Sequence, residues 1–182
     1  MAALCLAHAH SLAAMVARLT VASEKWSNGH EIASEVIERS DEAISDSLAL
    51  ADRDADAFDS VMAAYRTPKN EGSRESRRQA IREATIGAAI VPLETLVSAS
   101  ELLHKLLEMS RECNSNALTD LASSAELTHT AARMAEMNVR INTDYLDGED
   151  VDEIEHSAKE AMGRCDSALE GVRTSFMSRL GW

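Results

Sequence analysis

Five polar residues flank an apolar, Ala-, Leu- and Met-rich stretch in the second half of the chain. Asn114, Asn116 and Asp120 open this stretch, and Asn138 and Asn142 close it. Asn and Asp are mediocre helix formers, and a polar group on a buried helix face costs free energy unless it has a partner. These side chains are therefore either satisfied within the fold or available to a ligand. A carboxylate among amides suits proton transfer next to hydrogen-bonded recognition.

The spacing of these residues places them on one helix face but far apart along it. Asn116 and Asp120 are four residues apart, as are Asn138 and Asn142, so each pair shares a face. Asp120 and Asn138 are eighteen residues apart, which is five turns and ~27 Å along a helix axis. One small ligand cannot contact both ends of the same helix.

Two copies of this helix packed antiparallel would remove the separation. His129 lies nine residues from Asp120 and nine from Asn138. A two-fold axis near His129 would bring Asp120 of one chain close to Asn138 of the other and create two equivalent composite sites. We therefore predict a homodimer that assembles the site. The alternative is that other helices of the same chain complete each end separately.

Helical periodicity and turn signals define the elements that must position these residues. Helices are expected over about 2–23, 30–66, 74–91, 116–145 and 150–179, with turns at 26–29, 67–72 and 147–148. Ser73 is a plausible N-cap, and Pro92 either kinks the third helix or separates it from another that ends near Cys113. No period-two alternation predicts a strand. We expect one domain, 1–182, folded as an all-α bundle of five to six long helices.

The charge balance and the apolar segments restrict the possible partners. The net charge of −13 argues against nucleic acid and anionic membranes, and no stretch is expected to be long and apolar enough to span a bilayer. Met1 to Val16 is apolar like a signal peptide, but it lacks a basic start and contains His8 and His10, which favours a core helix. The three cysteines form no CxxC pair, which predicts free thiols and a cytoplasmic location.

Positive charge is concentrated around Pro68 in this acidic chain. The basic residues are Arg66, Lys69, Arg74, Arg77, Arg78 and Arg82. They form either a solvated face with salt bridges to acidic neighbours or an anion-binding rim suited to a substrate that carries carboxylates.

Motifs for other chemistries are missing from the sequence. The histidines are scattered without the spacing of a metal site, and neither a GxSxG elbow nor a GxGxxG or Walker loop occurs. We therefore expect no metal and no nucleotide cofactor.

Several segments resemble, in order, the motifs of a known family. Residues 54–58 (DADAF) and 68–69 (PK) are similar to its D-x-x-A-F and P-K elements. Residues 114–121 (NSNALTDL) resemble its G-N-x-N-A-x-[ST]-D-L segment, and residues 138–142 (NVRIN) resemble its N-V-x-I-N segment. The family comprises the cyclodeaminase domain of formiminotransferase-cyclodeaminase and stand-alone methenyltetrahydrofolate cyclohydrolases. The resemblance covers about residues 2–146.

The resemblance implies a dimeric, all-helical enzyme of one-carbon folate metabolism. A cyclohydrolase adds water to 5,10-methenyltetrahydrofolate and gives 10-formyltetrahydrofolate, whereas a cyclodeaminase closes 5-formiminotetrahydrofolate to the methenyl form and releases ammonia. The chain contains no formiminotransferase domain, which favours the cyclohydrolase. A non-catalytic helical folate-binding or scaffold protein is the remaining alternative.

The resemblance also implies roles for individual residues. Asp120 is expected to be the general base, and Lys69 to transfer a proton or hold developing negative charge. The implied substrate-binding residues are Asn114, Asn116, Asn138, Asn142, Asp54, Arg78 and Arg82. The folate is the substrate, and no separate cofactor is expected.

Two positions depart from the family pattern. The Gly-rich segment that precedes the family's first helix has no counterpart ahead of Met1, which leads us to expect either a truncated chain or reduced activity. Cys113 replaces a glycine, so strain is expected there if the backbone needs a positive φ.

Overall fold

Five α-helices form most of the chain in a computed structural model that describes residues 1–69 and 73–182. They are α1 (Ala2–Val21), α2 (His30–Arg66), α3 (Arg74–Met109), α4 (Leu118–Thr143) and α5 (Glu149–Leu180). Two 3₁₀ turns, Glu24–Gly29 and Ser115–Ala117, precede α2 and α4. The described residues contain no strand, so the prediction of an all-α bundle is confirmed.

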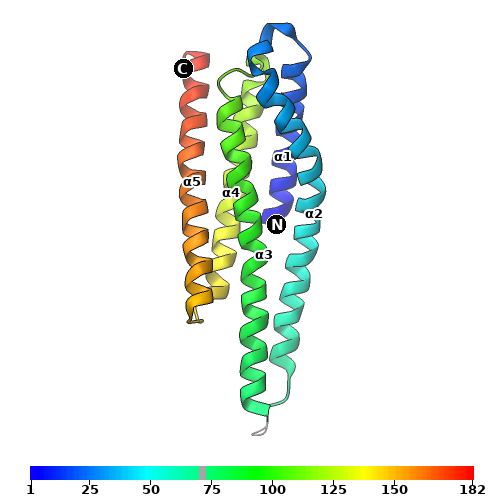
Figure 1. Cartoon of the computed structure of the whole chain (residues 1–182), viewed down its shortest axis with the longest axis vertical. Helices are drawn as coiled ribbons and strands as arrows, with labels where there is room; N and C mark the ends of the chain where they lie inside the picture. Colours follow the sequence, from blue (N-terminus) through cyan, green and yellow to red (C-terminus); the bar gives the residue numbers. More distant parts are fainter. Residues whose placement is uncertain (70–72) are drawn as a thin grey trace.

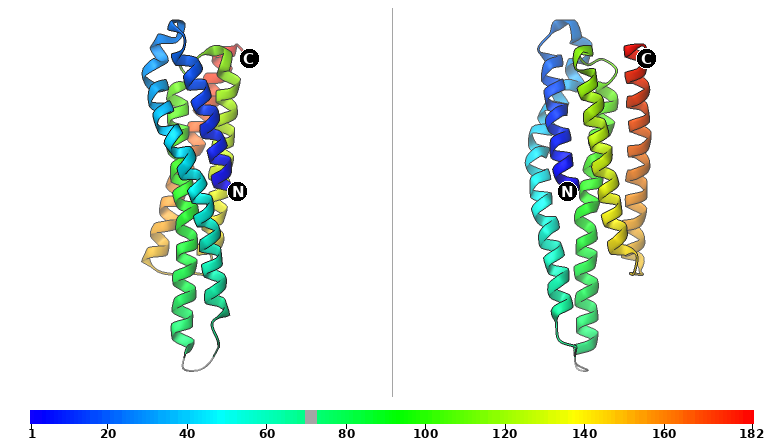
Figure 2. Two further views of the ribbon diagram at one scale, coloured as in Figure 1. Left: turned by 90° about the vertical axis from the view of Figure 1, so that its right-hand side faces the viewer. Right: turned by 180° about the vertical axis from the view of Figure 1, so that it is seen from behind.

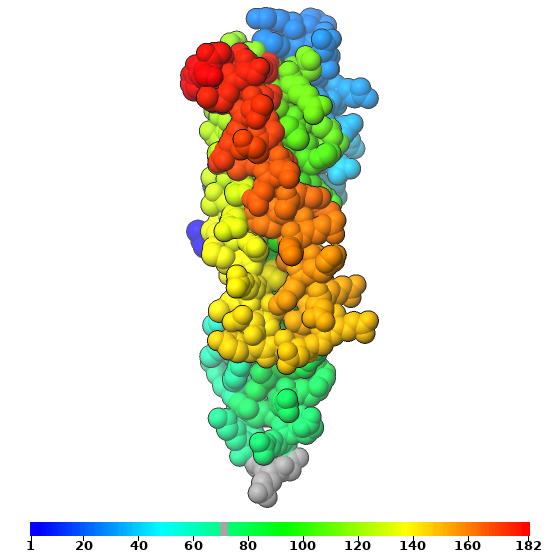
Figure 3. Space-filling model, turned by 90° about the vertical axis from the view of Figure 1, so that its left-hand side faces the viewer, coloured from blue at the N-terminus to red at the C-terminus, as the bar shows by residue number. Residues whose placement is uncertain are grey.

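The first four helices pack in a ring, and the fifth helix lies outside it. α1 packs against α2 and α4, and α3 packs against α2 and α4, which closes a four-helix core. α5 packs mainly against α3 and α4, and it covers one side of the molecule (Figure 3). Seen from behind, α1 and α4 lie side by side on one open face of the bundle (Figure 2).

α1 is a core helix, as predicted. Leu6, Ala9, Ala13, Val16 and Ala17 are fully buried and recur at helical spacing along its inner face. Because most of these side chains are small, the neighbouring helices approach α1 closely.

The expectation that no segment could span a membrane is wrong by length and composition. α1 and α3 each contain a window of sufficient length, with mean hydropathies of 1.4 and 1.5. In both helices 56% of that window is buried against other helices of the bundle. The apolar side chains of α1 and α3 therefore serve, in large part, to pack these helices into the core of the bundle.

α2 and α3 form a long hairpin that extends beyond the other helices (Figure 1). α2 has the predicted bounds, and Thr67 to Lys69 follow it outside any helix. The rest of the predicted loop, Asn70, Glu71 and Gly72, lies outside the described residues. Ser73 is the N-cap residue of α3, but its hydroxyl donates to the carbonyl of Pro68 at 3.1 Å and does not cap the helix.

α3 continues through Pro92 without a break. The alternative in which Pro92 separates two helices is therefore wrong, and α3 ends at Met109, before Cys113. Proline lacks an N–H group and leaves the carbonyl four residues earlier, that of Ala88, without its helical donor. The side-chain Nδ2 of Asn142 donates to this carbonyl at 2.9 Å.

The turn between α4 and α5 depends on Gly148 and Arg82. Gly148 has a φ of +130°, a conformation that L side chains rarely adopt. Arg82 of α3 donates to the Asp147 carbonyl at 2.9 Å and to both carboxylate oxygens of Asp150 at 2.7 and 2.9 Å. These bonds fix the start of α5 against α3.

Candidate functional site

The two polar groups of α4 lie at opposite ends of one continuous helix. We call Asn114, Asn116 and Asp120 the upper group, and Asp54, Asn138 and Asn142 the lower group. Because α4 is unbroken from Leu118 to Thr143, Asp120 and Asn138 remain ~27 Å apart along its axis. No single small ligand bridges the upper and lower groups of the same chain.

In the upper group, Asn114 is engaged in the fold. Its Nδ2 donates to the Leu19 carbonyl at 3.1 Å, and its Oδ1 accepts from the backbone N–H of Asn116 at 3.0 Å. Its own backbone N–H donates to Thr20 Oγ1 at 3.0 Å. These bonds tie the end of α1 to the start of α4 and indicate a structural role for the Asn114 side chain.

Asp120 and Asn116 present free polar atoms. Asp120 lies in the first turn of α4, where the helix dipole favours a negative charge, and its side chain is half-buried. Within the described ranges, neither its carboxylate nor the exposed amide of Asn116 makes a hydrogen bond or ion pair with another side chain. Both side chains are therefore available to a ligand or to a second chain.

In the lower group, Asn142 is engaged and Asn138 is free. The Nδ2 of Asn142 donates to the carbonyls of Ala88 and Asn138, both at 2.9 Å. The side chain of Asn138 is exposed and bonds to no other described residue. Asn142 thus connects α4 to α3, and Asn138 projects from the connected segment.

Asp54 lies close to the N-terminus of α1. Leu50 and Ala57 of α2 pack in one cluster with Ala3 of α1 and Val91 of α3. Asp54 shares their helix face, since the three α2 positions follow at i, i+4 and i+7. The first N–H groups of α1 have no intrahelical acceptors and carry the positive end of its dipole. Four helices therefore meet around the lower group.

Apolar side chains are exposed around the lower group. α1 begins at mid-height of the bundle, so it does not cover the lower halves of α2 and α3 (Figures 1 and 2). The exposed apolar residues are Phe58, Met62 and Tyr65 of α2, Ile90 of α3, and Met137 and Ile141 of α4. Phe58 is 63% exposed and Ile141 is 65% exposed. Side chains this apolar indicate a surface that another molecule covers.

The basic residues near Pro68 divide into paired and free groups. Arg82 is bound to Asp150, and this ion pair raises the pKa of Arg82 and lowers that of Asp150. Arg77 donates to the carbonyls of Tyr65 and Thr67, both at 3.0 Å. Arg82 therefore serves as a clamp between α3 and α5, which makes it a poor candidate for the substrate tail.

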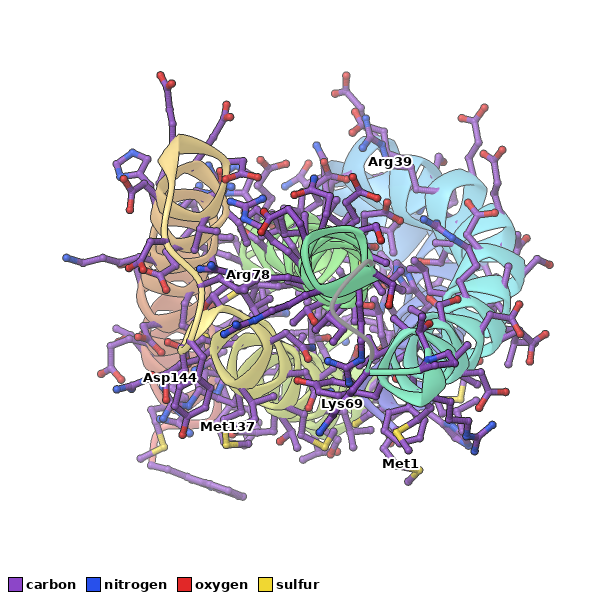
Figure 4. The ribbon with its side chains drawn as sticks, turned by 90° about the horizontal axis from the view of Figure 1, so that it is seen from below. Met1, Arg39, Lys69, Arg78, Met137 and Asp144 are labelled. Carbon is purple, nitrogen blue, oxygen red and sulfur yellow. The ribbon has the colours of Figure 1, made fainter. Side chains whose placement is uncertain are left out.

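Lys69 and Arg78 remain free for a ligand. Both are exposed, and neither bonds to another residue in the part of the chain that the structure describes. Seen from below, Lys69 lies on the same side of the molecule as Met1 and Met137, whereas Arg39 lies on the opposite side (Figure 4). Lys69 thus shares a side with Met1 and Met137 but lies at the other end of the bundle from Asp120.

His129 does not lie on the face that carries Asp120 and Asn138. Its Nε2 contacts Asp166 of α5 at 2.7 Å. Nine residues correspond to two and a half turns, so His129 projects from the opposite side of α4. The predicted two-fold axis therefore cannot pass through the His129 ring. At that height the face shared by Asp120 and Asn138 carries Leu127 and Ala131, which pack in the core of the same chain.

Cys113 is not strained. No residue other than glycine has a positive φ among the described residues, so the strain expected for Cys113 is absent. Arg179 donates to its carbonyl at 2.6 Å and approaches its Sγ at 3.3 Å. Burial raises the pKa of the Cys113 thiol.

A buried histidine that lines a cavity was not predicted from the sequence. His10 is 4% exposed, contacts Ser40 Oγ at 3.1 Å, and has a pKa lowered to about 4 by burial. It lines a cavity of about 760 Å³ between α1, α2 and α3, whose rim includes Glu35, Arg39 and Lys105. The position of His10 on the inner face of an Ala-rich helix could have indicated that it is buried. In the described ranges, no group of three or more His, Cys, Asp or Glu residues is arranged for a metal ion.

Comparisons with known proteins agree with the motif order. The sequence profile of the formiminotransferase-cyclodeaminase family matches residues 1–161. A methenyltetrahydrofolate cyclohydrolase of Methylorubrum extorquens is 29% identical over 138 residues, which are 75% of this chain and 66% of that protein. The formimidoyltransferase-cyclodeaminase of Rattus norvegicus is 30% identical over 133 residues, which are 72% of this chain and 25% of that protein. The chain thus spans less than two thirds of the length of these relatives.

The fold also matches a solved structure. A formiminotetrahydrofolate cyclodeaminase from Thermotoga maritima superposes with a TM-score of 0.87 over 100% of this chain and 87% of that chain, at 24% identity. This similarity establishes the helical architecture.

Proposed function

Because the chain belongs to the formiminotransferase-cyclodeaminase family, we propose that it is a one-carbon folate enzyme, a 5,10-methenyltetrahydrofolate cyclohydrolase that forms 10-formyltetrahydrofolate. The observation that carries this proposal is the family match over residues 1–161, which includes both polar groups. A relative of similar sequence is named as such a cyclohydrolase. The names of the relatives speak against the non-catalytic scaffold.

The free carboxylates suit this reaction. The methenyl carbon is cationic, and a carboxylate close to it stabilises the cation and accepts a proton from the attacking water. We assign that base role to Asp120, a contribution of ~10²–10⁴-fold in rate. Asp54, at the junction of four helices, would supply the second negative charge near the cationic carbon.

We assign proton return and substrate recognition to the other free polar side chains. After water adds, the bond from the bridging carbon to one ring nitrogen breaks, and that nitrogen needs a proton, which we assign to Lys69. The amides of Asn116 and Asn138 offer donors and acceptors for the edge of the pterin. Arg78 would bind the carboxylates of the glutamate tail. Water and these side chains suffice, so we propose no cofactor.

The site needs two chains in this proposal. Asp120 lies ~27 Å from Asn138 along one chain, on the same face of α4. An antiparallel homodimer would join the upper group of one protomer to the lower group of the other and would cover the apolar residues near Phe58. We also propose a cytoplasmic location, which the three free cysteines favour.

Absorbance of the methenyl form tests the function directly. The purified chain is expected to accelerate loss of 5,10-methenyltetrahydrofolate, and Asp120→Asn to slow it by ~10²-fold or more. Asp144→Asn, at an exposed acid that follows the same helix, is the matched control and should keep full turnover. Full turnover by Asp120→Asn would eliminate the base role.

The cyclodeaminase is the second candidate, because other relatives carry that name. Appearance of the methenyl form from 5-formiminotetrahydrofolate, together with release of ammonia, would identify it. If neither substrate is converted, the proposal of a folate enzyme is wrong.

A further inference from the structure

A proline inside a continuous helix leaves one carbonyl without a donor. Pro92 is buried in the middle of α3 and has no N–H for the carbonyl of Ala88. An unsatisfied buried carbonyl destabilises a fold. The helix nevertheless runs unbroken from Arg74 to Met109.

Asn142 of α4 supplies the missing donor. Its Nδ2 lies 2.9 Å from the Ala88 carbonyl, where the backbone N–H of residue 92 would donate in an ordinary helix. The same nitrogen donates to the Asn138 carbonyl at 2.9 Å. Both hydrogens of the amide are therefore used, and only the oxygen remains for other contacts.

This pair of bonds lies at the centre of the lower group. Val91, next to Pro92, packs in the cluster that contains Ala3 at the start of α1 and Leu50 beside Asp54. Asn138 is one turn before Asn142 on the same face of α4. The bond to Ala88 thus connects α4, which carries Asn138, to the cluster of Ala3, Leu50 and Val91 next to Asp54.

We propose that Asn142 is a positioning residue that replaces the hydrogen bond Pro92 cannot make, and thereby fixes Asn138 relative to Asp54 and the start of α1. The role in catalysis rests on the proposed function; the role in the fold does not. If Asn142 only positions Asn138, it becomes dispensable once residue 92 can donate its own N–H. If Asn142 binds the substrate directly, it stays necessary whatever residue occupies position 92.

A double-mutant cycle between positions 92 and 142 tests the structural part without any substrate. Asn142→Ala is expected to lower Tm by roughly 3–8 °C, because it leaves the Ala88 carbonyl unsatisfied. In the Pro92→Ala background, the same change should lower Tm by less than half as much, since the backbone of residue 92 then donates to Ala88. Equal losses in both backgrounds would overturn the proposal.

Two further variants keep the test decisive. Asn142→Asp has the same shape but no donor and would place a carboxylate against two carbonyl oxygens, so it should lower Tm at least as much as Asn142→Ala does. Asn138→Ala removes an exposed amide from the same face while it keeps the carbonyl that Asn142 uses, so its Tm should not change. If Asn142→Ala fails to fold, folding of the Pro92→Ala, Asn142→Ala double variant supports the proposal, and failure of both overturns it.

Turnover then separates positioning from substrate contact. Asn142→Ala should lower kcat/KM of whichever folate reaction the protein catalyses, and Pro92→Ala should restore most of that loss. The loss of kcat/KM could instead persist unchanged in the Pro92→Ala background while the loss of Tm shrinks as expected. That result would show that Asn142 contacts the substrate. If wild-type protein converts neither folate, the proposed function fails while the Tm cycle still decides the structural part.

Discussion

At the residue scale, His10 makes the stability of the bundle depend on pH. Burial lowers its pKa to about 4, so the unfolded chain binds a proton between pH 6.5 and 4 that the folded chain does not. Folding stability is therefore expected to fall as the pH decreases through this interval, by up to roughly 3 kcal/mol. Chemical denaturation at pH 7 and at pH 4.5 measures this loss.

Substitution isolates the contribution of His10 from the carboxylates that titrate in the same interval. His10→Gln removes the titrating group, so the difference in unfolding free energy between pH 7 and pH 4.5 should shrink. His8→Gln, at an exposed position of the same helix, should leave that difference unchanged. An undiminished pH dependence in His10→Gln would contradict the assignment.

Single residues also show where prediction from sequence ends. Spacing along one helix identified Asp120 and Asn138, and both side chains are free in the structure. It gave no indication that Asn114 and Asn142 are bonded to Leu19 and Ala88, because those carbonyls belong to other helices. Only one local feature indicated such a bond: Pro92 has no N–H, so the Ala88 carbonyl needs a donor from elsewhere.

At the scale of elements, Arg179 holds the connection between α3 and α4 against α5. Its guanidinium donates to the carbonyls of Ser110 and Cys113 at 2.7 and 2.6 Å and to Ser115 Oγ at 2.9 Å. These acceptors follow the end of α3 and precede Asn116, so the clamp sets the start of α4.

Loss of this clamp should be costly. Arg179→Ala leaves several half-buried acceptors without a charged donor, and we expect a loss of roughly 2–4 kcal/mol in unfolding free energy. Arg133→Ala breaks an exposed ion pair with Glu136 and should cost less than about 0.5 kcal/mol. Urea denaturation of both variants compares them, and equal effects would refute the clamp.

Element boundaries followed closely from the sequence where the signals were local. Gly29, Pro68 and Gly148 mark turns, and the helices on either side begin and end within a few residues of the predicted positions. Pro92 was the exception. A helix continues through a proline more readily when the freed carbonyl finds another donor, and the donor from α4 could not be predicted from the neighbours of Pro92.

At the scale of the whole molecule, the exposed apolar residues near the lower group predict a homodimer. Sedimentation should show a dimer for the wild-type chain, and Phe58→Glu should weaken it by at least about tenfold in Kd, because a charge would be buried at the interface. Leu48→Glu is the matched control, since Leu48 is exposed on another face of α2. A monomeric wild-type chain that is nevertheless active would exclude the composite site.

Mixing two inactive variants tests whether the protomers share one site. If Asp120 of one chain works with Asp54 of the other, Asp120→Asn and Asp54→Asn homodimers each have two defective sites. After the variants are unfolded and refolded together, half of the dimers are mixed, and each mixed dimer has one site with both carboxylates intact and one with neither. Turnover should therefore recover to about a quarter of the wild-type value. If both carboxylates instead belonged to a site within one chain, every site would still lack one of them and the mixture would stay inactive. The geometry of a single chain, with Asp120 near one end of the bundle and Asp54 near its middle beside the start of α1, favours recovery.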